Sequence, residues 1–147
     1  MTTDRRIKAL SNNFPILIID DSEGERELVK IAFTELGIDN EIIFFSNGFT
    51  FLEYIRSETK GTFLILCDVN MPGLTGMDIK KIVQDDKQLR LKCIPFILFS
   101  TSSANTSVKE AYSHGVQGYF IKPNDIEQLI EIFYAIVCYW NFSETPK

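Results

Sequence analysis

The side chains best suited to chemistry each follow a short apolar run of the sequence. The segment ILIIDD ends in Asp20 and Asp21, LILCD ends in Asp68, FILFS ends in Ser100, and GYFIK ends in Lys122. Three carboxylates and one lysine sum to a charge of about −2, which would be costly to leave unbalanced in a half-buried cleft. A divalent cation would balance it, and oxygen ligands favour Mg²⁺ over zinc.

The acid pair also has a simpler explanation. Asp20 and Asp21 could cap the helix that follows them, as aspartates often do. However, Ser22 is available for that role, because Ser22 and Glu25 have the spacing of a capping box. Since polar groups follow three further apolar runs, we favour the metal site.

A cation beside a third carboxylate and a lysine is typical of phosphoryl transfer. That chemistry needs mainly alignment of donor and acceptor and neutralisation of charge on the transferring oxygens. Asp68 would be the nucleophile and would form an aspartyl phosphate. Lys122 and the cation would neutralise the phosphoryl oxygens, and Ser100 would donate a hydrogen bond to one of them.

These residues can act together only if the apolar runs lie side by side in one sheet. Five such runs recur along the chain: Ile16–Ile19, Glu41–Phe45, Phe63–Cys67, Phe96–Phe99 and Gly118–Ile121. Helix-like segments alternate with them, which predicts an α/β fold with a parallel sheet covered on both faces. The carboxyl ends of parallel strands share one edge of the sheet, and ligands bind there.

Five helices are expected between and after these strands. The apolar spacing and the cap signals predict helices over Ser22–Gly37, Phe51–Ile55, Met77–Val83, Val108–Gly115 and Asn124–Trp140. In the first helix, Leu28, Ala32 and Leu36 form the expected buried face. The charged run Asp85–Lys92 predicts a solvated loop.

Composition bounds the class of protein. The chain has 147 residues, 45% hydrophobic and 24% charged, which is typical of one globular domain. A net charge of −5 argues against nucleic-acid binding. The three cysteines form no CxxC pair, and no apolar run is long enough for a membrane span. We therefore expect a cytoplasmic protein that binds neither nucleic acid nor membrane.

From Phe14 to Trp140 the sequence resembles the receiver domain of two-component response regulators. The resemblance rests on four segments in their order and spacing: LIIDD, LILCDVNMPG, PFILFS and GYFIKP. It implies a flavodoxin-like (βα)5 three-layer sandwich with a sheet of order 2-1-3-4-5. Residues 1–13 would then be a polar, mobile N-terminal extension, residues 14–140 the receiver domain and residues 141–147 a C-terminal tail.

The resemblance also implies residue roles. Asp68 would be the phosphoacceptor, assisted by Ser100 and Lys122, and the ligands of Mg²⁺ would be Asp20, Asp21, Asp68 and the backbone carbonyl of Asn70. Tyr119 would be a switch aromatic that responds to movement of Ser100. The Lys122–Pro123 peptide bond would be cis, which proline permits.

By the same resemblance the protein would be a single-domain response regulator rather than an enzyme, although it would take part in its own phosphorylation and dephosphorylation. A histidine kinase or a His-containing phosphotransfer protein would be the phosphoryl donor. Only seven residues follow Trp140, so we expect no attached output domain. Output would come from docking to a target protein through residues 108–115, 118–121 and 126–140, and a homodimer is compatible with this.

Three other functions stay open. A receiver-like scaffold would not take phosphate. An aspartyl-phosphate phosphatase usually has a second acid two residues after the nucleophile, where Asn70 stands. A flavin carrier could use Ser100–Ser107 for a phosphate, but flavodoxins place that loop after the first strand. Finally, Thr101 stands where the family commonly has a smaller residue, so we expect it to slow phosphorylation by small donors.

Overall fold

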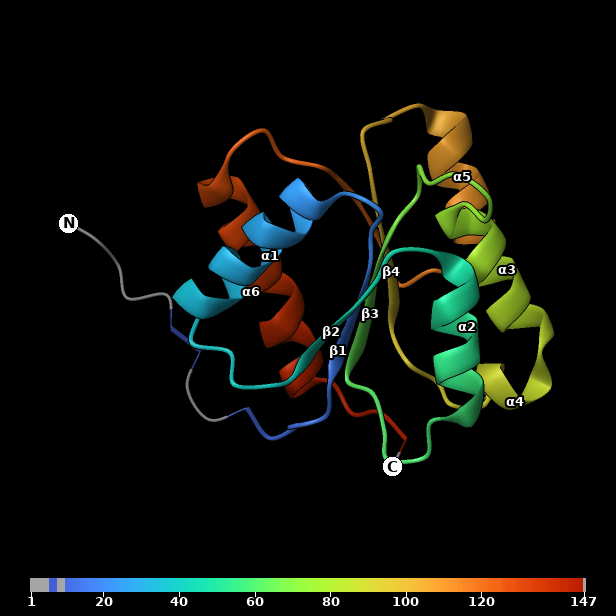
Figure 1. Ribbon diagram of the computed structural model, residues 1–147, viewed down its shortest axis with the longest axis horizontal. Helices are drawn as coiled ribbons and strands as arrows, with labels where there is room; N and C mark the ends of the chain where they lie inside the picture. Colours follow the sequence, from blue (N-terminus) through green and yellow to red (C-terminus); the bar gives the residue numbers. More distant parts are fainter. Residues whose placement is uncertain (1–5, 8–9, 147) are drawn as a thin grey trace.

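A five-stranded parallel sheet forms the centre of the protein. The computed structural model describes residues 6–7 and 10–146 (Figure 1). The strands are β1 Ile16–Ile19, β2 Ile42–Phe45, β3 Leu64–Asp68, β4 Phe96–Ser100 and β5 Gly118–Ile121. Their order is β2-β1-β3-β4-β5, and every neighbouring pair is parallel. This confirms the predicted α/β fold and its sheet order.

Helices cover both faces of the sheet, as Figure 1 shows. They are α1 Glu23–Glu35, α2 Gly48–Ser57, α3 Gly76–Asp85, α4 Lys87–Arg90, α5 Asn105–Ser113 and α6 Ile126–Phe142. Helices α1 and α6 pack on one face, where the rings of Phe33 and Phe133 stack with centroids 4.6 Å apart. Helices α2, α3, α4 and α5 bury apolar side chains on the other face, around Phe51 and Phe96.

The structure corrects three local predictions. The run Asp85–Lys92 contains the short helix α4, because Asp86 caps its first turn and Leu89 is buried in the core. Leu28 was predicted to be buried but is 45% exposed, and its neighbour Val29 is buried instead. The cap of α6 is Asp125 rather than Asn124, since the Asp125 carboxylate accepts from the Gln128 N–H at 2.8 Å.

Part of the N-terminal segment lies against the domain. The Ile7 N–H donates to the Leu36 carbonyl at 2.8 Å, and Leu10 packs on the core between α1 and α6. The Ser11 N–H donates to Asn141 Oδ1 at 3.0 Å, near the end of α6. The remaining residues of the predicted mobile extension, 1–5 and 8–9, lie outside the described residues. Within the described part of the chain, no helix is long and apolar enough to cross a bilayer.

Candidate phosphoacceptor and metal site

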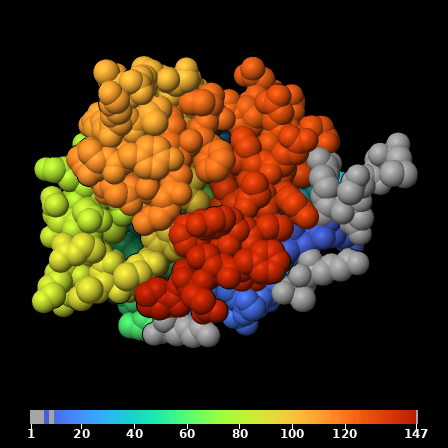
Figure 2. Space-filling model, turned by 180° about the vertical axis from the view of Figure 1, so that it is seen from behind, coloured from blue at the N-terminus to red at the C-terminus, as the bar shows by residue number. Residues whose placement is uncertain are grey.

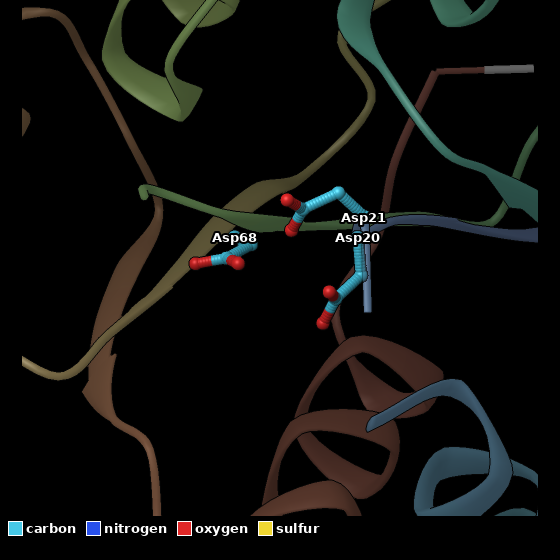
Figure 3. A group of neighbouring side chains, drawn as sticks. All are labelled: Asp20, Asp21 and Asp68. Carbon is cyan, nitrogen blue, oxygen red and sulfur yellow. The ribbon is translucent and has the colours of Figure 1, made fainter. Parts of the chain in front are cut away.

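Three carboxylates meet at the carboxyl edge of the sheet. Strands β1 and β3 pair in parallel with Ile19 opposite Cys67, so the residues that follow each strand end lie side by side. One ligand oxygen from each of Asp20, Asp21 and Asp68 lies within 4.8 Å of the others (Figure 3). Asp20 and Asp68 are 7% and 5% exposed, whereas Asp21 is exposed. The predicted acid cluster is therefore present, with one side open to solvent.

The donor set fits a hard divalent cation. All three side chains offer carboxylate oxygens, and two of them are largely removed from water. Buried carboxylates need a nearby positive charge or hydrogen bonds. A Mg²⁺ ion commonly uses such carboxylates and fills its other positions with water or phosphate oxygens. The exposed side of the cluster leaves room for those further ligands.

Asp68 is the last residue of β3 and is held by neighbours on both carboxylate oxygens. The Asn70 N–H donates to its Oδ1 at 3.0 Å, and Lys122 Nζ lies 3.0 Å from its Oδ2. Burial raises the pKa of Asp68 above its ordinary value, although Lys122 and Asn70 act in the opposite direction. The backbone of Gly76 packs closely against the end of β3, because a Cβ at this position would lie only 2.5 Å from the Asp68 carbonyl oxygen.

Lys122 reaches the acids from the end of β5. Its backbone N–H donates to the Ser100 carbonyl at 2.8 Å, which continues the pairing of β4 and β5 by one residue. Its Nζ lies 2.5 Å from Glu25 Oε2 and 3.8 Å from Asp20 Oδ2, in addition to its contact with Asp68. Burial lowers the pKa of Lys122, but the carboxylates outweigh burial and the net shift is upward. The side chain is therefore a charged ammonium.

The predicted cis bond between Lys122 and Pro123 is wrong. Throughout the described residues, every peptide bond is trans. The trans form is lower in energy even before proline, by about 0.5–1 kcal/mol. Because the backbone of Lys122 continues the strand, its long side chain reaches Asp68 without a change of isomer.

Ser100 and Tyr119 are joined through a third residue, Ser102. Ser100 is 1% exposed, and its Oγ accepts a hydrogen bond from the Ser102 N–H at 3.0 Å. The Tyr119 hydroxyl donates to the Ser102 carbonyl at 2.7 Å. The Tyr119 ring is partly buried against the core on the α2–α3 face. The two predicted switch residues are thus connected through one peptide segment of the loop that follows β4.

Sequence reasoning missed Glu25 as a site residue. Ser22 Oγ accepts from the Glu25 N–H at 3.3 Å, as predicted, but the Glu25 carboxylate turns to Lys122. Burial and its hydrogen bond with Glu25 raise the pKa of Asp20 to about 7. Burial also acts to raise the pKa of Glu25, yet hydrogen bonds with Asp20 and Lys122 make the net shift downward. The available signal was an acid in the first turn of a helix that begins at the site.

Comparison with known proteins agrees with this geometry. The family profile described as "Response regulator receiver domain" matches residues 16–134. The chemotaxis protein CheY-3 of Vibrio cholerae is 34% identical over 115 residues, covering 78% of this chain and 84% of that protein. The probable methanogenesis regulatory protein FilR2 of Methanothrix harundinacea is 30% identical over 131 residues, covering 86% and 83%. The crystal structure of response regulator RPA3017 of R. palustris superposes with a TM-score of 0.82 at 25% identity, covering 90% and 98%.

Proposed function

Because the chain belongs to the response regulator receiver family, we propose that it is a signalling protein that accepts a phosphoryl group on Asp68. The supporting observation is the environment of this carboxylate. Asp68 is buried at the carboxyl edge of the sheet, its Oδ2 lies 3.0 Å from Lys122 Nζ, and it shares a cluster with Asp20 and Asp21. A nucleophile beside an ammonium and a cation-binding cluster suits phosphoryl transfer.

In the proposed reaction Asp68 attacks the phosphorus atom of a phosphohistidine on a histidine kinase or phosphotransfer protein. A bond forms between a carboxylate oxygen and phosphorus while the bond from phosphorus to the imidazole nitrogen breaks, and its electron pair returns to the imidazole. Lys122 remains charged and stabilises the phosphoryl oxygens. Ser100, at the end of β4, donates a hydrogen bond to them once its hydroxyl leaves its present contact with Ser102.

We propose Mg²⁺ as the cofactor, held by the carboxylates of Asp20, Asp21 and Asp68 and by the backbone carbonyl of Asn70. The oxygen donors and the burial of two of the acids support this choice. When bound, Mg²⁺ supplies positive charge that offsets the charge on the phosphoryl group.

We further propose that output is phosphorylation-dependent docking of a target protein on the face formed by α5, β5 and α6. These segments (orange to red in Figure 2) share one surface of the molecule. Five of their large apolar side chains are exposed: Tyr112, Ile121, Tyr134, Tyr139 and Phe142. Exposed aromatic and aliphatic groups are common at protein interfaces. A target protein or a second copy of the chain is the proposed occupant.

Intact-mass spectrometry tests phosphorylation directly. The protein is incubated with Mg²⁺ and acetyl phosphate beside an Asp68→Asn variant. We expect the parent alone to gain the mass of one phosphoryl group, which alkali removes. If neither protein gains mass, the chain is a receiver-like scaffold that does not take phosphate. If the protein instead hydrolyses phosphate esters continuously, it is an aspartyl-phosphate phosphatase.

A further inference from the structure

Lys122 has a third carboxylate partner that the reaction described above does not use. Its Nζ lies nearer to Glu25 Oε2, at 2.5 Å, than to Asp68 Oδ2, at 3.0 Å. We propose, on the basis of the function proposed above, that Glu25 is a positioning residue: its carboxylate holds the Lys122 ammonium beside Asp68 for phosphoryl transfer.

Glu25 is itself fixed at the start of α1. Its N–H donates to the Ser22 side chain, and one turn further Val29 is buried between α1 and the sheet. The Glu25 carboxylate therefore extends from a stretch of backbone that is anchored to the core. Lys122 lies on a different element, beyond the end of β5, so the contact with Glu25 ties that strand end to α1.

The Lys122 side chain is largely buried, but packing does not enclose it on every side. Lys122 and Pro123 line a cavity of about 190 Å³ between the sheet and helices α1 and α6, whose walls include Leu66 and Phe99. A lysine side chain is flexible, and the cavity provides no steric restraint on the side that it adjoins. On that side, ionic contacts at Nζ hold the ammonium in place, and the shortest of them is to Glu25.

The other carboxylates are less suited to this role. Asp20 Oδ2 is 3.8 Å from Lys122 Nζ, and Asp20 Oδ1 accepts from the Ser22 N–H at 2.9 Å. Asp20 and Asp68 both belong to the cluster that fits a metal ion, whereas Glu25 does not. When a cation binds to Asp20 and Asp68, Glu25 is the carboxylate that remains to hold Lys122. Lysine has three N–H donors, so it can contact Glu25, Asp68 and a phosphoryl oxygen together.

The variant Glu25→Gln keeps the size of the side chain and removes its charge. Glu23→Gln is the matched control, because Glu23 lies in the same first turn of α1, is exposed, and changes the net charge equally. The first measurement needs no phosphorylation: brief labelling of lysine amines by an activated ester, followed by peptide mass spectrometry. We expect labelling of Lys122 to rise severalfold in Glu25→Gln and to stay at the parent level in Glu23→Gln, with Lys30 and Lys109 as internal references.

The second measurement is the rate of phosphorylation by acetyl phosphate and Mg²⁺ as the donor concentration varies. We expect the maximal rate to fall about tenfold in Glu25→Gln, since a misplaced catalytic group is costly, and to stay near the parent value in Glu23→Gln. In a Lys122→Met background, Glu25→Gln should have no further effect, because Glu25 acts through Lys122. An effect that adds to that of Lys122→Met would contradict the proposal.

The outcomes separate this inference from the proposed function. If the parent takes no phosphoryl group, the proposed function is wrong, and labelling of Lys122 still decides whether Glu25 holds the ammonium. If the parent is phosphorylated but Glu25→Gln matches Glu23→Gln in both measurements, Glu25 has no positioning role. Should Glu25→Gln instead abolish Mg²⁺ binding in calorimetry, Glu25 is a metal ligand and the positioning role is likewise overturned.

Discussion

Lys122 Nζ lies 3.0 Å from Asp68 Oδ2, although β4 separates their two strands in the sheet. The contact spans the end of β4, where Ser100 is placed, and brings three strand ends into one site. Among the described residues, Lys122 is the one cation that the structure places in contact with Asp20, Asp68 and Glu25. Because the acids outnumber this cation, we expect the site to be sensitive to pH and to divalent cations.

Stability without metal should fall as pH rises. The pKa of Asp20 is about 7 in the folded protein, against an ordinary value of 3.8, because of burial and Glu25. Between these values the folded state binds more protons than the unfolded state, so the free energy of unfolding decreases with pH. We expect a loss on the order of 2 kcal/mol from pH 4 to pH 7, because the raised pKa of Asp68 acts in the same direction as that of Asp20 and the lowered pKa of Glu25 acts in the opposite one. Urea unfolding in EDTA measures it.

The Asp20→Asn variant is the control for this pH dependence. Its free energy of unfolding should vary less over the same range, and Mg²⁺ should stabilise it less than the parent at pH 7.5. A parent whose stability rises steadily from pH 4 to pH 7, with no difference from Asp20→Asn, would contradict the raised pKa.

Gly76→Ala should displace Asp68, the proposed phosphoacceptor. A Cβ at this position would lie 2.5 Å from the Asp68 carbonyl oxygen and 3.0 Å from Val69 Cα, and both are backbone atoms. We expect destabilisation of about 2 kcal/mol or more and slower phosphorylation. Gly24→Ala is the control, because its nearest contact would be Ser22 Oγ at 3.9 Å. Equal stability of the two variants in thermal unfolding would show that β3 and α3 separate easily.

Thr101→Ala should open the entrance to Asp68. Asn70 Nδ2 lies 3.4 Å from Thr101 Oγ1, so the loops after β3 and β4 touch on the exposed side of the site. Removing the hydroxyl and methyl groups should increase the rate with acetyl phosphate about threefold. Ser103→Ala, an exposed hydroxyl in the same loop, should leave the rate unchanged. A Thr101→Ala rate equal to that of the parent would contradict a steric role for Thr101.

Tyr119→Phe should loosen the loop after β4. The variant loses the hydrogen bond from the Tyr119 hydroxyl to the Ser102 carbonyl while the ring stays in place. We expect a loss of about 1 kcal/mol in stability and faster amide hydrogen exchange in residues 101–104. The control is Tyr134→Phe, on the exposed side of α6. Unchanged exchange in residues 101–104 would mean that the loop is held by other contacts.

The sequence was sufficient for the sheet and for the positions of Asp20, Asp21, Asp68, Ser100 and Lys122. The residue at which each apolar run ends can be read directly from the sequence. A parallel sheet brings these ends to one edge, independently of the conformation of the loops. Glu25 was not predicted because its backbone satisfies a helix-cap pattern, which does not determine where a side chain points. Helix α4 was missed because one buried leucine anchors an otherwise charged segment.

The isomer of the Lys122–Pro123 bond could not be predicted from the sequence for a different reason. The local sequence Lys122–Pro123 permits either isomer, and the choice depends on how the strand meets the site. Here the Lys122 backbone pairs with Ser100, and the side chain already reaches Asp68. Tertiary contacts of this kind have no signature in a short segment of sequence.

Ser102 receives a hydrogen bond at its carbonyl from Tyr119 and gives one from its amide to Ser100. Rotation of the Ser100 hydroxyl towards a newly bound group would either break the amide contact or carry the whole residue with it. In the second case the movement reaches the Tyr119 hydroxyl, since its partner atom belongs to the same residue. A change at Ser100 would then reach Tyr119 through Ser102 alone, over the width of one amino acid. No rearrangement of the sheet would be needed.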